Sequence, residues 1–187
     1  MKNSLYPSAK QDKQQSEIVI DREFIKKMPV FSGLNDPEID AVCEKLHEIT
    51  VAAGDTIIRD GEKGDTMYLL LYGEVDVSKQ LTLRVSRRKF DQRDKQFIRL
   101  NAGMYAFFGE MAMFEDESIR SATVTATEES RLAQINQKDF NDLCESNHRI
   151  GFLLLRNIIK VLCGRLNKAN QDVLKLTTAF SIALETH

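Results

Sequence analysis

The order of apolar and polar residues divides the chain into three parts. Residues 18–46 show two helical patterns joined at PVFSGLNDPE, and in the second pattern Ile39, Val42, Cys43 and Leu46 repeat at spacings of three and four. Asp36 is the expected N-cap of this second helix, with Pro37 in the first turn, where proline is tolerated. One apolar helix face is therefore predicted ahead of the central part of the chain.

The central part, residues 47–135, consists of short alternating or fully apolar runs. Turn sequences such as AAGD, RDGEKGD, LYGE and NAG separate these runs about every ten residues, a spacing typical of a small all-β sandwich or barrel. The candidate strands are ITVA, DTIIR, TMYLLLYG, EVDVSKQLTLRV, KQFIRL, SATVTAT and SRLAQI.

The last part predicts a short helix from Gln137, capped by Asn136, and then a long helix from about Asn147. The long helix has no strong stop signal, so it spans about 30 to 38 residues, or roughly 45 to 57 Å. Ten apolar residues follow alternating steps of three and four along it: Phe152, Leu155, Ile159, Leu162, Leu166, Ala169, Val173, Leu176, Phe180 and Ala183. In the first turns Leu153, Leu154, Ile158 and Val161 widen this stripe, which indicates packing on the chain's own domain. Beyond Leu166 only the narrow seam remains, and it favours a coiled-coil homodimer through this helix.

Length and composition fit a single globular domain with an appendage. The chain has 187 residues and a formal net charge of -2, so it has no overall attraction to DNA or to an anionic membrane. The expected organisation is a disordered tail at 1–17, a β-domain with flanking helices at 18–146 and a dimerisation helix at 147–187. Without an apolar signal core or a bilayer-length apolar run, we expect a cytoplasmic protein. Cys43, Cys144 and Cys163 are interpreted as reduced core thiols.

The segment FFGEMAMFEDESIRSATVTA, residues 107–126, carries the candidate chemistry. Gly109 allows a sharp turn, after which GEMAMF can form a short helix whose first N–H groups face an anion. Glu110 can accept from a sugar hydroxyl, Arg120 offers a fork for two phosphate oxygens, and Ser121 adds a hydroxyl and an N–H. Taken singly, Arg120 is better explained as a surface ion pair with Glu115 or Glu117, and Glu110 as a helix-end carboxylate. The order F-G-E-x-A followed by R-S-A-T-V instead favours a phosphate-binding site between Phe108 and Val124.

At these residues the chain resembles the cyclic nucleotide-binding domains of catabolite activator proteins, protein kinase A regulatory subunits and cyclic nucleotide-gated channels. The resemblance covers about residues 22–180, including VFSGL, AAGDTIIRDGEKGDTMYLLLYGEVDV and RLAQINQKDF. It implies an α+β fold, an eight-stranded antiparallel, jelly-roll-like β-roll flanked by N-terminal helices and a long C-terminal helix. It also implies a ligand, cAMP or cGMP, with cAMP favoured. The ligand-binding residues carried over from the family are Phe108, Gly109, Glu110, Met111, Ala112, Arg120, Ser121, Ala122, Arg165 and Asn170.

Three departures from the family pattern affect the predicted site. Two extra residues lie between Gly103 and Gly109, and we expect a β-bulge there. By the resemblance, F-G-E-x-A and R-S-A-T-V together form the family's phosphate-binding cassette. Ser121, which follows the cassette arginine Arg120, does not decide between cAMP and cGMP. On the long helix, Ala169 and Asn170 occupy the positions of the base-contacting hydroxyl residues. Arg165 is kept, and by the resemblance it pairs with Glu110 when ligand is bound.

The expected function is regulatory: ligand binding repositions the long helix, and no catalytic residue or metal ligand is predicted. A cupin-like metal site is a rival, but His47, His148 and His187 lie outside the central strands. The alternatives are a transcription regulator truncated before its helix-turn-helix, so that this chain alone binds no DNA, and a degenerate domain that binds nothing. Residues 84–95 contain six basic and two acidic residues, which we interpret as a solvated hairpin end between two strands.

Overall fold

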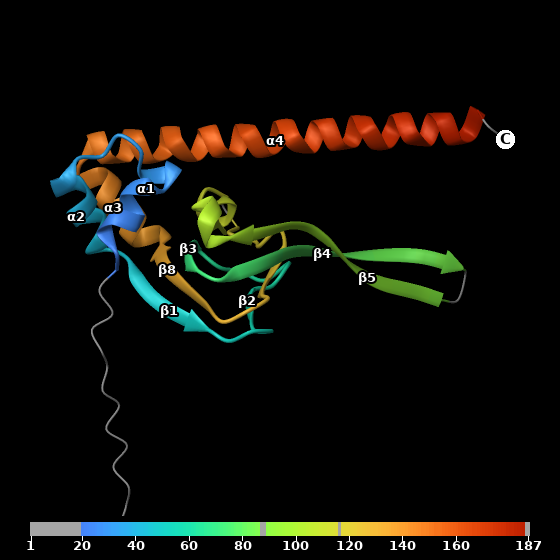
Figure 1. The fold of residues 1–187 in the computed structure, drawn as a ribbon, viewed down its shortest axis with the longest axis horizontal. Helices are drawn as coiled ribbons and strands as arrows, with labels where there is room; N and C mark the ends of the chain where they lie inside the picture. The colour runs from blue at the N-terminus through green and yellow to red at the C-terminus, as the bar shows by residue number, and fades with distance from the viewer. Residues whose placement is uncertain (1–19, 87–88, 116, 186–187) are drawn as a thin grey trace, which may run out of the picture.

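The computed structural model describes residues 20–86, 89–115 and 117–185, so the predicted tail at 1–17 lies outside the described residues. Helices gather at one end of a roll of strands, and a single long helix crosses them and projects beyond the roll (Figure 1). The α-helices are α1 (Arg22–Lys27), α2 (Asp36–Cys43), α3 (Gln137–Ser146) and α4 (His148–Glu185). The strands are β1 (His47–Val51), β2 (Thr56–Ile58), β3 (Thr66–Tyr72), β4 (Glu74–Ser86), β5 (Lys89–Asn101), β6 (Phe107–Phe108), β7 (Thr123–Ala126) and β8 (Ser130–Asn136).

The eight described strands form two antiparallel sheets of four. One sheet has the order β1-β8-β3-β6 and the other β2-β7-β4-β5, as expected for a β-roll. The predicted fold class is therefore confirmed. Strand β6 was not among the candidate strands, because its two residues are too few to show an alternating pattern.

Alternation along β3 and β6 places side chains in two separate cores. Met67 and Leu69 of β3 join Phe107 of β6 in a core shared with the helices. Leu70 and Phe108 join a second core that fills the inside of the roll. Because successive strand residues point to opposite faces, this sheet is buried on both sides.

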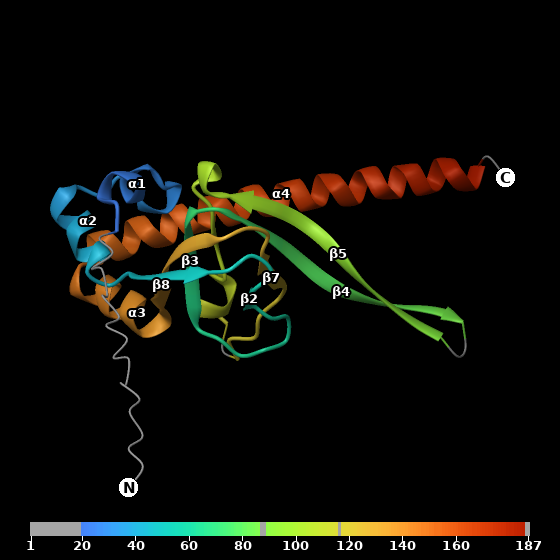
Figure 2. The same ribbon diagram turned by 60° about the horizontal axis from the view of Figure 1, so that its bottom comes forward.

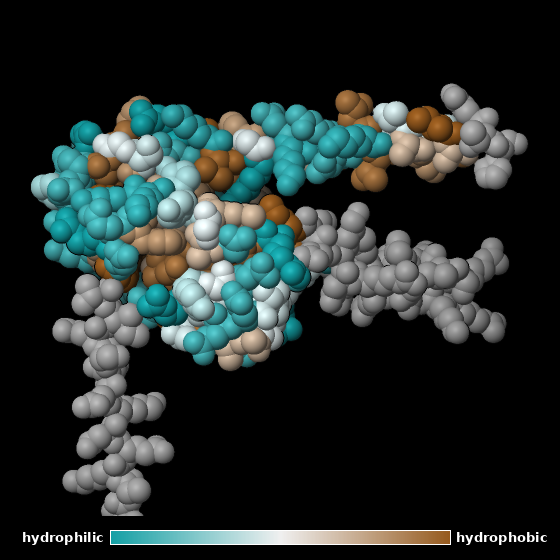
Figure 3. All heavy atoms as spheres, in the orientation of Figure 1, coloured by the Kyte–Doolittle hydropathy of each residue, from teal (hydrophilic) through white to brown (hydrophobic). Residues whose placement is uncertain are grey.

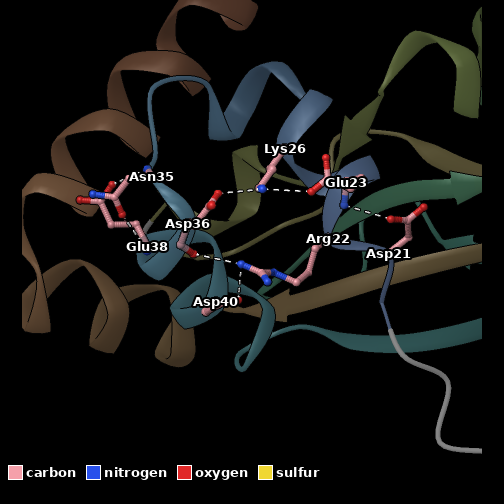
Figure 4. Close-up of polar contacts among 8 residues, drawn as sticks. All are labelled: Asp21, Arg22, Glu23, Lys26, Asn35, Asp36, Glu38 and Asp40. Atoms are coloured by element: carbon pink, nitrogen blue, oxygen red, sulfur yellow. Dashed lines mark hydrogen bonds and ion pairs between the residues drawn. The ribbon is translucent and has the colours of Figure 1, made fainter.

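The N-terminal helices are fixed by caps and ion pairs (Figure 4). Asn35, rather than the predicted Asp36, is the N-cap of α2, and it forms a capping box with Glu38. Asp36 is the first helical residue and pairs instead with Lys26 of α1 at 2.7 Å. The prediction was one residue late because Asn and Asp are comparable N-caps, and here Asn35 has the capping-box acid three residues on.

Helix α4 has 38 residues, as predicted, and its first turns are bound to the N-terminal segment. The Asn147 side chain caps it by accepting from the Arg149 and Ile150 N–H groups. Buried Asn157 donates to the carbonyls of Val30 (3.1 Å) and Ser32 (2.8 Å). Leu153, Leu154 and Ile158 are buried on the same side, which confirms the predicted packing of this part of the helix.

Two other expectations are corrected. Residues 84–86 and 89–95 belong to β4 and β5 themselves, so the basic stretch lies within a long hairpin and not between two strands. The hairpin and α4 project in the same direction in both views (Figures 1 and 2). Cys163 is an exposed thiol, since it lies on α4 beyond the packed turns, whereas Cys43 and Cys144 are half-buried; all three are free. No helix in the described ranges is long and apolar enough to cross a membrane.

The contact between Glu38 and Arg149 joins α2 to α4 and generates a pH-dependent prediction. The Arg149 guanidinium and the Asn35 N–H lower the pKa of Glu38 below its ordinary value of 4.5. Glu38→Gln keeps an acceptor for the cap but removes the charge, so we expect a loss of about 1 kcal/mol in unfolding free energy at pH 7. The stabilisation is present above the unfolded-state pKa and is lost as pH falls through the folded-state pKa. Urea unfolding at pH 7 and pH 3.5 measures it.

The control is Glu129→Gln, a change at an exposed position between β7 and β8. It should leave stability unchanged at both pH values. An equal loss for Glu38→Gln at pH 7 and at pH 3.5 would show that the charge is not responsible.

Candidate functional site

The candidate site begins where β6 ends, at the inner edge of the roll. Phe107 and Phe108 anchor the strand in the two cores, and Tyr68 stacks on Phe108 with ring centroids 5.6 Å apart. Gly109 then turns the backbone with a φ of +79°, a conformation that favours glycine. The predicted short helix is a single 3-10 turn over Met111–Met113. Ala112 and Met113 are buried, so the turn is held firmly.

The two extra residues ahead of Gly109 form a turn rather than the expected β-bulge. Residues Ala102–Met104 make a 3-10 turn, and Tyr105 follows with a φ of +50°. The Tyr105 ring packs against Phe24 of α1 with centroids 5.2 Å apart. The insertion is accommodated before β6 starts, so Phe107 and Phe108 keep their two-sided burial.

Arg120 lies in the loop before β7, where backbone contacts with the β2–β3 loop fix its position. The Arg120 N–H donates to the Glu62 carbonyl, and the Arg120 carbonyl accepts from Gly61, both at 2.9 Å. The guanidinium donates to the Gly109 carbonyl at 3.0 Å. A Cβ at Gly64 would lie only 2.8 Å from Arg120 Nε, so the absence of a side chain at Gly64 makes room for the guanidinium.

The electrostatic environment of Arg120 is unusual for an arginine. The residue is buried, with 7% exposure, and no salt bridge joins it to a carboxylate within the described ranges. The predicted alternative, an ion pair with Glu115 or Glu117, is therefore not formed. Burial lowers the pKa of Arg120, and the nearby Tyr68 and Asp65 oppose that shift. An arginine nevertheless stays protonated at neutral pH, so the cavity contains a buried positive charge.

Arg165 of α4 joins the long helix to the cassette turn. Its guanidinium donates to Glu110 at 2.7 Å and to the Phe107 carbonyl at 2.6 Å, and it lies over the Phe107 ring at 5.1 Å. The Glu110 side chain is 4% exposed and the Arg165 side chain is 37% exposed. The pair predicted from the family pattern is thus formed, and it holds the middle of α4 against the roll.

These elements enclose a cavity of about 580 Å³. Nine of the ten predicted ligand-binding residues line it; Asn170 is not among them. Around them are apolar residues from β2, β4, β5, β7 and α4, together with two charged residues of α4. Val124 ends the predicted binding segment and Ala169 was placed at a base-contacting position. The lining residues outside the predicted site are Ile58, Val77, Ile98, Leu100, Lys168, Asp172, Val173 and Leu176.

Helical spacing could have found part of this missed set. Arg165, Lys168, Ala169, Asp172, Val173 and Leu176 recur at steps of three or four, so they share one helix face. Asn170, one residue after Ala169, points about 100° away from that residue. The residues of β4 and β5 had no local signal, because their place over the cavity depends on how the sheet curves. Among the described residues, no group of three or more potential metal ligands comes together.

Comparison with known proteins gives the family. A family model described as the cyclic nucleotide-binding domain matches residues 48–147, more than half of the chain. This chain belongs to the cyclic nucleotide-binding domain family. A cyclic nucleotide-gated potassium channel of Mesorhizobium japonicum is 28% identical over 150 residues, which is 80% of this chain and 37% of the channel. The chain spans between 10% and 61% of the length of this and other similar curated relatives.

Two solved structures extend the comparison. The catabolite activator protein of Thermus thermophilus is 26% identical, with a TM-score of 0.65 over 80% of this chain and 63% of that one. The regulatory domain of Toxoplasma gondii protein kinase A, solved with cAMP, is 25% identical, with a TM-score of 0.59 over 74% of this chain and 48% of that one. The family and the fold implied by the cassette sequence are confirmed.

The backbone at Gly109 gives a prediction about the site's framework. A Cβ there would lie 2.9 Å from the Thr66 carbonyl and 3.0 Å from Arg120 Nη1, in addition to the cost of a positive φ. We expect Gly109→Ala to lower the unfolding free energy by about 2–3 kcal/mol, measured by urea unfolding. Gly54→Ala is the matched control, because Gly54 has a similar φ of +88° and open space around it. Equal losses in the two variants would mean that crowding at Gly109 contributes nothing.

Proposed function

We propose that this chain binds a 3′,5′-cyclic nucleotide, cAMP or cGMP, in the cavity and performs no chemistry on it. The observation that supports this most directly is the guanidinium of Arg120. It is a buried cation with no carboxylate partner in the described chain, in a cavity whose walls are mainly apolar. A buried charge without a counter-charge is costly, and an anionic ligand removes that cost.

The anion end of the cavity fits a cyclic phosphate. Arg120 offers two donors, Ser121 adds a hydroxyl and an N–H, and the turn at Ala112 adds a backbone N–H. One carboxylate oxygen of Glu110 accepts from Arg165, and the carboxylate has further acceptor positions for a ribose 2′-hydroxyl, next to Gly109. These are the roles that the cassette has in the family.

The base end has a different set of groups from the one expected. Ala169 lines the cavity without a polar group, whereas Lys168 and Asp172 place an ammonium and a carboxylate at the lining. A carboxylate can accept from N–H groups of either purine: guanine offers N1–H and N2–H, and adenine offers N6–H. The groups at the phosphate end therefore support binding of a cyclic nucleotide. The groups at the base end are compatible with both adenine and guanine, so titration with cAMP and cGMP has to measure the preference.

We infer that ligand binding is signalled through α4. Arg165 contacts Glu110 and the Phe107 carbonyl, and the cavity lining continues from there along α4 to Leu176. A ligand that contacts both the cassette and this face stabilises one position of the helix relative to the roll. The required coupling is the difference in ligand affinity between two helix positions. We also propose that an effector, an unidentified partner in the cytoplasm, detects this change.

We also propose that α4 forms a homodimer. Beyond the packed turns its apolar seam is uncovered: Leu166 is 61% exposed and Phe180 is 65% exposed. Apolar side chains gather on the projecting end of the helix (Figure 3). In a parallel pair, Asn170 occupies the position that approaches Arg165 of the opposite helix. This pairing would give Asn170 its predicted place at a ligand site, in the other copy's cavity.

The first test is titration calorimetry with cAMP and with cGMP. Arg120→Ala should weaken binding at least about 100-fold, because it leaves the phosphate without its charged partner. Arg120→Lys should recover only part of the affinity, since an ammonium cannot form the bidentate contact. Arg59→Ala, a change of an exposed arginine outside the cavity lining, should bind as wild type does. Failure of the wild type to bind either nucleotide would favour a degenerate structural domain.

The second test concerns the dimer. Leu166→Asp with Phe180→Asp places charges in the seam, which would have to be buried on pairing, so dimerisation should weaken at least about 100-fold. The control is Gln171→Asp with Thr178→Asp, which puts the same charges on the opposite helix face. Light scattering should give twice 21.3 kDa for the wild type and the control, and 21.3 kDa for the seam variant. A wild type that is monomeric at 100 times the cellular concentration would exclude the dimer.

A further inference from the structure

Lys79 of β4 is not among the residues that line the cavity, but it contacts Ser121, which does. Val77, two residues earlier on the same strand face, lines the cavity, and Ser78 pairs with Thr123 at the start of β7. The Lys79 ammonium donates to the Ser121 carbonyl at 3.2 Å. Its side chain is 46% exposed, so the charge is at the surface while the stem follows the strand. The ammonium therefore sits beside the cassette residue that follows Arg120.

A second contact keeps Lys79 in this place. Asp60 of the β2–β3 loop pairs with the ammonium at 3.5 Å, and the Asp60 N–H donates to the Thr123 hydroxyl at 3.1 Å. The loop, β4 and the entry to β7 thus meet at one point. Lys79 thus binds the Ser121 carbonyl, while Ser121 and Ala122 line the cavity. The Ser121 hydroxyl has one weak contact, to Met111 Sδ at 3.8 Å.

The balance of charge around the anion end points the same way. Arg165 is neutralised by Glu110, and Arg120 supplies one buried positive charge, on which the nearby Asp65 acts without forming a salt bridge. Lys79 adds a second cation, which Asp60 compensates only at a distance of 3.5 Å, between side chains in contact with water. A cation at the surface acts on an approaching anion over about 10 Å at moderate salt, and it does so in addition to the buried guanidinium.

We propose that Lys79 is a positioning residue of the anion end and its second cation: it orients Ser121 and attracts the ligand's phosphate to Arg120. This inference rests on the proposed function. It assigns to β4 a part of the site that the segment between Phe108 and Val124 does not contain. The attraction acts mainly on the association rate, and it is weakened by salt.

The experiment compares wild type, Lys79→Met and Lys79→Arg by stopped-flow and equilibrium titration with cAMP and cGMP, at 20 mM and 300 mM salt. We expect Lys79→Met to weaken binding about three- to tenfold at low salt, chiefly through a slower association, and to flatten the salt dependence of the association rate. Lys79→Arg keeps the charge and should bind within about twofold of wild type. The matched control is Lys138→Met, which also removes one exposed lysine that is paired with an aspartate, but on α3, a helix with no residue in the cavity lining.

The outcomes separate this inference from the proposed function. Wild type that binds neither nucleotide overturns the proposed function and the role of Lys79 with it. Wild type that binds, together with equal affinities and equal salt slopes for Lys79→Met and Lys138→Met, overturns the role of Lys79 alone. A loss in Lys79→Met that is the same at both salt concentrations and is not recovered by arginine would show a purely structural role, which also contradicts the proposal. Thermal unfolding of each variant accompanies the titrations.

Discussion

The constraint on which the structure depends is the burial of one sheet on both faces. Phe107 and Phe108 are neighbours in sequence, yet one is packed against the helices and the other fills the roll. A strand of only two residues cannot slip in register without placing both rings in the wrong core, so the start of the cassette is fixed more strongly than its length suggests. Gly109 follows at once, and the positions of Glu110, the 3-10 turn and the carbonyl that holds Arg120 all depend on that fixed start.

The same constraint explains why α4 has two parts with different anchors. Up to Ile158 the helix is held by core contacts and by Asn157, which satisfies two backbone carbonyls of the N-terminal segment. From Cys163 to Leu184 its residues are exposed except for Arg165, which is half-buried against Glu110 and Phe107. The Phe107 backbone carbonyl is one of the groups that Arg165 binds, so the roll contacts the second part of α4 through a residue that is buried in the core shared with the helices. The binding segment and α4 are therefore in direct contact at Arg165, separately from the packed first turns.

The sequence predicted correctly those features that depend on residues close to one another in the chain. The alternation of β3, the cap at Asn136 and the length of α4 follow from spacing and from side chains near one another in sequence, and the structure has them. The N-cap of α2 was predicted at Asp36 and lies at Asn35, because both residue types are good N-caps. A β-bulge was predicted before β6 and a 3-10 turn is found, because an insertion can be accommodated in either way. The cassette residues were found through their order. Ile98, Leu100 and Val77 were not, because long-range strand pairing brings them to the cavity.

The cavity's two ends differ in how they are built, and this difference bears on specificity. The anion end is assembled from backbone carbonyls, glycines and a buried arginine, all placed by sheet pairing and tight turns. The base end is formed by one face of α4 opposite β4 and β5, where Leu176 and Ile98 both line the space. A single substitution on the exposed face of a helix changes the chemistry of that face without disturbing a strand. A substitution in the cassette also disturbs the strand pairing and tight turns that position it. The proposed phosphate site is therefore more constrained than the proposed base site, where Lys168 and Asp172 join Arg165 as the charged lining residues of α4.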